Sequence, residues 1–130
     1  MTVEELRNNP ILKNVQSMKI GMIYLNYFIQ TPETNALELD LLVEGITRDD
    51  SNYVIIFEFK NRDEKKPTQN EVQDFIQKIE MLKYSLNRQG KQNTKICSIY
   101  FSANGFDKTI ENGLHDNNIL TADMNSWEIV

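Results

Sequence analysis

The pattern of hydrophobic and polar residues divides the chain into predicted strands and helices. Residues 69–88 carry apolar side chains at helical spacing and follow Thr68, which forms a capping-box pattern with Glu71. Strand-length apolar runs, rich in β-branched and aromatic residues and bounded by turn-forming residues, make up the other regular segments. The predicted strands lie at 18–30, 36–44, 53–60, 95–103 and 118–123, and the predicted helices begin at Thr2, at 69 and at Asp107.

The order of these elements predicts an α/β fold. The first two strands are joined by a short turn and are expected to form a hairpin, which the third strand follows. The long helix between the third and fourth strands implies a right-handed crossover between parallel neighbours. We therefore expect a mixed β-sheet flanked by helices, in three layers or nearly so, formed by residues 1–130 as a single domain.

Length and composition indicate a globular protein. The chain has 130 residues, of which 40% are hydrophobic, enough for one buried core. No apolar run approaches the roughly 20 residues that span a bilayer, and the N-terminal segment lacks a signal-peptide pattern. The single cysteine, Cys97, cannot form an internal disulfide, so a reducing, cytoplasmic location without a membrane is expected.

Charge is distributed unevenly along the chain. The formal net charge of −5 argues against a protein that coats nucleic acid. Residues 60–95, however, contain nine Lys and Arg against five Asp and Glu. This basic stretch is either a nucleic-acid contact or the ordinary solvated surface of a helix. A single histidine excludes a His-rich metal site as the main chemistry, and the lack of a glycine-rich phosphate loop removes support for a kinase or nucleotide-driven motor.

Two predicted strands carry charged residues that their apolar pattern does not explain. Asp40 lies in LELDLLVEG, residues 37–45, while Glu58 and Lys60 end the apolar run YVIIFEFKN, residues 53–61. Side chains two positions apart share one face of a strand, so Glu58 and Lys60 are expected to point the same way. Antiparallel pairing of the two strands would bring Asp40 near Glu58, giving two carboxylates and one ammonium group at the end of the sheet.

This combination of groups suits a magnesium-dependent reaction at a phosphodiester. Mg²⁺ keeps several waters and takes only one or two carboxylates from the protein, here Asp40 and Glu58, with the carbonyl oxygen of Phe59 as a third candidate ligand. A bound metal polarises the phosphodiester and activates a water molecule. Lys60 can orient that water or stabilise developing negative charge.

The same residues resemble the PD-(D/E)XK nuclease superfamily, which has the restriction-endonuclease-like fold. Asp40 matches the family's Asp, and Glu58 and Lys60 match its (D/E)-x-K triplet, although Leu39 precedes Asp40 where the family often has Pro. The resemblance covers roughly residues 36–101. It implies a restriction-endonuclease-like core and an endonuclease dependent on Mg²⁺ or Mn²⁺. It also implies two further catalytic candidates, which are Glu5 in the first helix and Gln73 in the helix after the triplet.

The predicted function is metal-dependent hydrolysis of phosphodiester bonds in DNA, in preference to RNA. Contacts to phosphates are expected from basic side chains, because non-specific affinity for nucleic acid is mainly electrostatic. Because the chain as a whole is acidic, we expect a partner protein or a second copy of the chain to contribute to nucleic-acid binding. The candidate contacts are Lys65, Lys66, Lys83, Arg88 and Lys91.

Three alternatives remain open at the level of sequence. The first is a nuclease-fold domain that no longer cuts and serves as an interaction or assembly module, because a fold does not fix a function. The second is a plain α/β domain that binds a small acidic or basic ligand, in which Asp40 and Glu58 would lie far apart. The third makes both carboxylates solvated acids on an edge strand, with Lys60 in a weak surface salt bridge.

Overall fold

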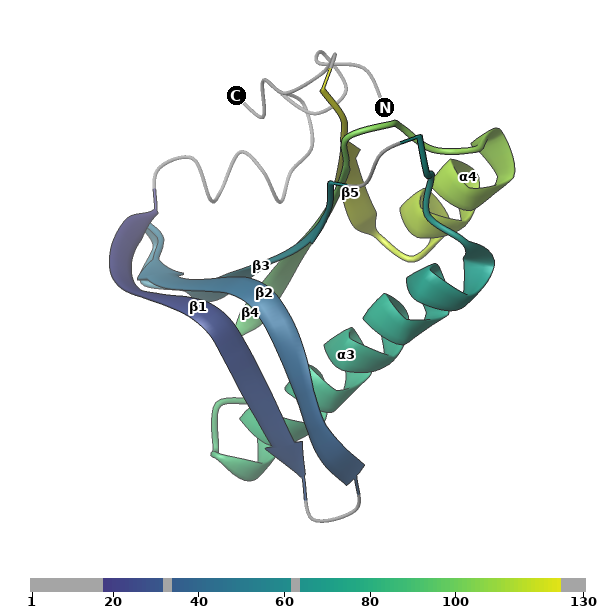
Figure 1. Cartoon of the computed structure of the whole chain (residues 1–130). Coiled ribbons are helices and arrows are strands. Elements are labelled where there is room, and N and C mark those ends of the chain that lie inside the picture. Colours follow the sequence, from purple (N-terminus) through teal and green to yellow (C-terminus); the bar gives the residue numbers. More distant parts are fainter. Residues whose placement is uncertain (1–17, 32–33, 62–63, 125–130) are drawn as a thin grey trace.

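A five-stranded sheet packed against two helices forms the part of the chain that the computed structural model describes, residues 18–31, 34–61 and 64–124 (Figure 1). The strands are β1 (Lys19–Thr31), β2 (Thr34–Ile46), β3 (Asn52–Lys60), β4 (Lys95–Ser102) and β5 (Ile119–Ala122), and the helices are α3 (Gln69–Arg88) and α4 (Lys108–Asp116). The elements predicted within these ranges are confirmed, and the α/β class with them. The helix predicted from Thr2 lies outside the described residues.

The order of the strands explains why both described helices lie on one face of the sheet. Strands β1, β2 and β3 are antiparallel neighbours, whereas β3, β4 and β5 are parallel neighbours in that order. Two right-handed crossovers that step in the same direction put their helices on the same face, as Figure 1 shows for α3 and α4. The described residues thus form two layers. The sequence predicted three or nearly so, and one of its predicted helices, the one from Thr2, lies outside the described residues.

Helix α3 has the bounds that its sequence predicts. The Thr68 hydroxyl accepts a hydrogen bond from the Glu71 backbone N–H at 3.2 Å, and Glu71 Oε1 accepts one from the Thr68 N–H at 3.1 Å. This capping box satisfies two backbone donors that a helix otherwise leaves without partners. The chain leaves the helix through Gly90, whose φ of +74° favours glycine. None of the helices in the described ranges is long and apolar enough to cross a membrane.

The hydrophobic core lies between α3 and the sheet and extends beneath the β1–β2 hairpin. Ile29 and Leu39, on the outer part of the hairpin, belong to the same buried cluster as the apolar face of α3. Full burial of such a side chain contributes about 1.5–3 kcal/mol, so the hairpin is held firmly over the helix. Cys97 is buried, and burial raises the pKa of its thiol to about 12. The buried residues of α3 are Val72, Phe75, Ile79, Leu82 and Leu86.

Candidate active site

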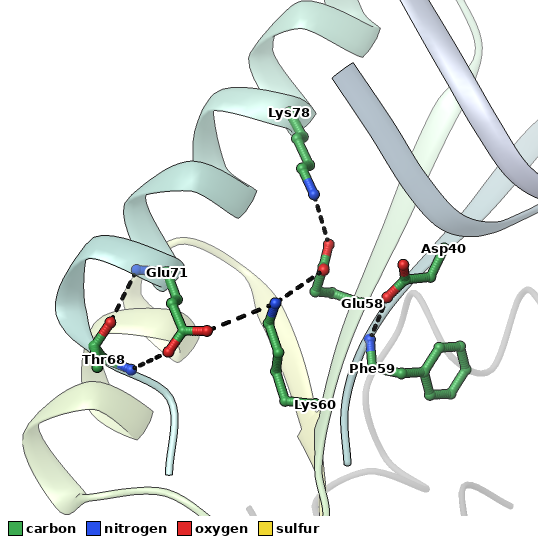
Figure 2. A network of polar contacts seen from close by, with 7 residues as sticks. All are labelled: Asp40, Glu58, Phe59, Lys60, Thr68, Glu71 and Lys78. Carbon is green, nitrogen blue, oxygen red and sulfur yellow. Dashed lines mark hydrogen bonds and ion pairs between the residues drawn. The ribbon is translucent and has the colours of Figure 1, made fainter. Parts of the chain in front are cut away.

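The site begins where strands β2 and β3 separate. Their antiparallel ladder ends at the pair Leu41 and Phe57, and β2 continues beyond this point paired with β1. Beyond this pair the Asp40 side chain replaces the backbone as the partner of β3, because its Oδ2 accepts a hydrogen bond from the Phe59 backbone N–H at 2.8 Å (Figure 2). A residue's N–H and C=O point toward the same neighbouring strand, so the Phe59 carbonyl lies on the Asp40 side of β3. The predicted antiparallel pairing of these strands is confirmed.

Glu58 is a buried carboxylate on the central strand of the sheet. Strand β3 lies between β2 and β4, and Glu58 is only 5% exposed on the face that packs against α3. Its two oxygens each contact a lysine: Lys60 Nζ lies 3.5 Å from Oε1, and Lys78 Nζ lies 3.2 Å from Oε2 (Figure 2). Glu58 is therefore not the solvated acid of an edge strand that one alternative required.

Burial and neighbouring charges act on Glu58 in opposite directions. Removal from water is the largest effect and raises the pKa of its carboxyl above the usual value of 4.5. The ammonium group of Lys78 lowers this pKa, the Asp40 carboxylate raises it, and Lys60 lowers it more weakly, so that the net direction is upward. Asp40 and Glu58 therefore lie close enough for their charges to interact, as the sequence predicted, and not far apart.

The first turn of α3 holds the lysine of the triplet. Glu71 Oε2 lies 3.6 Å from Lys60 Nζ, while its other oxygen caps the helix by accepting from the Thr68 N–H. One carboxylate thus links the start of α3 to the end of β3 (Figure 2). These groups border an open hollow of about 400 Å³, lined by Leu37, Glu58, Lys60, Glu71, Asp74, Phe75, Gln77 and Lys78.

The helix brings different residues to the hollow from those that the sequence indicated. Gln73 is exposed and does not line the hollow. Glu71 and Lys78 are seven positions apart, which is two helical turns, so they share a face from which Gln73 is turned away. The spacing of Lys78 from the capping-box residue Glu71 is the signal that could have identified it. Glu5, the other candidate from the resemblance, lies outside the described residues.

The five basic candidates for phosphate contacts do not form one patch. All five are exposed. Lys65 and Lys66 precede α3 at the end that carries the hollow, whereas Arg88 and Lys91 lie at its far end, with Lys83 between but nearer to them. A helix of 20 residues is about 30 Å long, so the two groups are far apart. Only Lys65 and Lys66 lie at the same end of the helix as Glu58.

The donor set fits a hard, oxygen-binding cation better than zinc. Asp40 and Glu58 offer two carboxylates, and the Phe59 carbonyl lies on the same side of β3 as Asp40. Mg²⁺ is commonly held by one or two protein carboxylates together with waters, and Glu58 borders an open hollow that has room for waters. Within the described ranges, no group of three or more His, Cys, Asp and Glu side chains could hold a metal ion, and a structural zinc site requires four ligands.

Comparison with solved structures identifies the fold. No family model and no curated protein matches the chain. It is similar to a repair endonuclease from Pyrococcus abyssi, with a TM-score of 0.50 and 15% identity over 93% of this chain and 44% of that one. It also aligns with a chain of an EndoMS-dsDNA2 complex, with a TM-score of 0.48 and 13% identity over 95% of this chain and 45% of that one. The chain spans less than half the length of either protein, and the likeness to the first confirms a restriction-endonuclease-like fold.

Proposed function

We propose that the chain is a metal-dependent nuclease of the PD-(D/E)XK type that hydrolyses phosphodiester bonds of DNA. The observation that carries the proposal is Glu58, a carboxylate buried on the central strand, which lies near Asp40 and contacts Lys60 and Lys78. A buried charge costs stability unless it is compensated, so its presence there favours a functional role. The likeness in fold to a protein described as a repair endonuclease supports the same proposal.

The side chains of the site would have different roles in hydrolysis of the phosphodiester. Asp40, Glu58 and the Phe59 carbonyl would hold Mg²⁺ or Mn²⁺, which when bound supplies Lewis-acid polarisation and an activated water. Lys60 directs its ammonium group into the hollow, where it can orient the attacking water or stabilise the charge that develops on the phosphate. Glu71 restrains Lys60 from the other side and so limits its movement.

The experiment that tests the proposal is a cleavage assay on single-stranded, duplex and branched DNA and on RNA, with Mg²⁺ or Mn²⁺. The variants are Asp40→Asn, Glu58→Gln and Lys60→Met, which keep the size of each side chain while they remove its charge. We expect the wild-type protein to cut DNA. Each variant should lose at least about a hundredfold in rate, the lower end of what a positioned acid–base group contributes.

Asp116→Asn is the matched control, because Asp116 is an exposed carboxylate at the last position of α4. This variant should cut as fast as the wild-type protein. If the three site variants also cut at the wild-type rate, the activity comes from elsewhere and the site assignment is wrong. If the folded wild-type protein cuts none of the substrates, the interaction or assembly module replaces the nuclease.

A further inference from the structure

Lys78 contributes a positive charge to the site from outside the triplet. Its Nζ lies 3.2 Å from Glu58 Oε2, a shorter contact than the 3.5 Å from Lys60 Nζ to Oε1. Lys60 is also within ion-pair distance of Glu71. Both oxygens of Glu58 are thus in contact with a cation, and the closer one comes from the middle of α3 (Figure 2). A divalent ion on Glu58 would need an oxygen that one of these ammonium groups now contacts.

We propose that Lys78 is an internal counter-ion of Glu58, a positioning residue that must leave this carboxylate before a divalent metal can bind. The inference rests on the nuclease proposed above and adds to it a determinant of metal affinity. The Lys78 ammonium compensates the buried charge of Glu58 when no metal is bound, and a metal ion takes over that role.

Distances explain why a metal ion on Glu58 and the Lys78 ammonium group would repel each other. Mg²⁺ binds carboxylate oxygens at about 2.1 Å. If the metal bound Oε2 of Glu58, an ammonium group that stayed 3.2 Å from this oxygen would lie within about 5 Å of the doubly charged ion. This arrangement is strongly repulsive in a partly buried site. The Lys78 side chain is 20% exposed and borders the open hollow, so its flexible stem can move the charge away from Glu58.

The hollow contains an acceptor for the displaced ammonium group. Asp74 lies four positions before Lys78 on α3 and lines the same hollow. Asp and Lys four positions apart on a helix are neighbours that can form an ion pair. Lys78 therefore has two alternative partners, Glu58 without metal and Asp74 with metal. A substrate phosphate in the hollow would be a third acceptor, so metal and DNA should strengthen each other's binding.

The test measures the affinity of the protein for Mn²⁺ in the absence of DNA. Titration calorimetry is carried out at mildly alkaline pH, where protons compete little with the metal for Glu58. Lys78→Met removes the charge and keeps an unbranched side chain. We expect it to bind Mn²⁺ about tenfold more tightly, because the wild-type protein must first give up the charged hydrogen bond from Lys78 to Glu58. Lys78→Arg, which keeps the charge, should bind like the wild-type protein.

Two further variants identify the cause of any change. Lys108→Met removes an exposed lysine from the first position of α4 and should leave the affinity unchanged. Asp74→Asn removes the acceptor and should weaken Mn²⁺ binding in the wild-type background. In the Lys78→Met background it should have a much smaller effect, which a double-mutant cycle measures. If Lys78→Met does not fold, Lys78→Gln is the substitute, because its amide can still donate to Glu58 without a charge.

The possible outcomes separate this inference from the proposed nuclease. If the wild-type protein binds Mn²⁺ and folded Lys78→Met binds it no more tightly, Lys78 is only a structural support and the inference is wrong, while the nuclease stands. If neither protein binds Mn²⁺, both proposals fail. If only Lys78→Met binds the metal, the counter-ion role is supported, and the native chain is held in a metal-free form.

Discussion

Glu58 is the residue at which local stability and the proposed chemistry oppose each other. Its environment raises the pKa of the carboxyl, which means that burial outweighs the favourable charges of Lys78 and Lys60. The apolar run around Glu58 is typical of a buried strand. It was not enough to predict Lys78, because a lysine beside the apolar face of a helix has the same pattern when it merely extends into solvent.

Replacement of Glu58 by Gln should therefore stabilise the metal-free protein. A folded-state pKa above the unfolded value means that the stability contribution of this group is full below the unfolded pKa and is lost as pH rises through the folded pKa. At neutral pH we expect Glu58→Gln to raise the Tm, and each kcal/mol gained shifts the Tm of a domain of this size by about 4 °C. The gain should vanish below about pH 4.5, where Glu58 is protonated in both states.

Thermal melts in EDTA across this pH range measure the effect. Glu80→Gln is the control, because Glu80 is an exposed carboxylate on α3 that pairs with Lys83 at the surface. Its Tm should follow that of the wild-type protein at every pH. A Glu58→Gln variant that is less stable than the wild-type protein at neutral pH would mean that the two lysines outweigh the cost of burial.

At the scale of elements, the sequence predicts features set by local signals, such as the start of a helix, better than features set by long-range contacts, such as the ends of a strand. Helix α3 was predicted to the residue, because Thr68 and Glu71 form a capping box that defines its start. Strand β2 runs from Thr34 to Ile46, beyond the predicted 36–44, because pairing with β1 extends it at both ends. The prediction that Gln73 belongs to the site rested on the family resemblance, and the face it occupies turns it away from the hollow.

Glu71 has two roles that different substitutions separate. Glu71→Gln should keep the helix cap, because Gln also serves at this position of a capping box, but it removes the charge that faces Lys60. We expect it to retain the wild-type Tm and to cut DNA between about tenfold and a hundredfold more slowly, the cost of a poorly positioned group. Thr68→Ala should do the reverse, losing about 1 kcal/mol of stability and little activity.

Melting curves and cleavage rates of the two variants decide between these roles. Equal loss of activity in both would mean that the start of α3, and not the charge of Glu71, positions Lys60. Loss of stability in Glu71→Gln without loss of activity would limit Glu71 to capping.

At the scale of the whole molecule, the topology determines which basic residues can act at the site. The parallel pairing of β3 with β4 requires α3 to run back along the sheet, so its two ends are far apart. Its first half, from Glu71 to Lys78, lies near Glu58, and its C-terminal end does not. The basic stretch at residues 60–95 is therefore continuous in sequence but divided in space, which charge counting along the chain could not reveal.

DNA bound at the candidate site should contact Lys65 and Lys66 more closely than Arg88 and Lys91. Lys66 pairs with Asp107 at 3.6 Å, but both side chains are largely exposed, so the pair is weak and Lys66 can exchange Asp107 for a phosphate. In a Glu58→Gln background, which prevents cleavage, the double change of Lys65 and Lys66 to Gln should reduce the slope of log K against log salt by about 2. The same change at Arg88 and Lys91 should alter it by less than 1. Fluorescence anisotropy with duplex DNA measures both slopes, and a larger effect at Arg88 and Lys91 would place the DNA at the far end of α3, away from the proposed metal ligands.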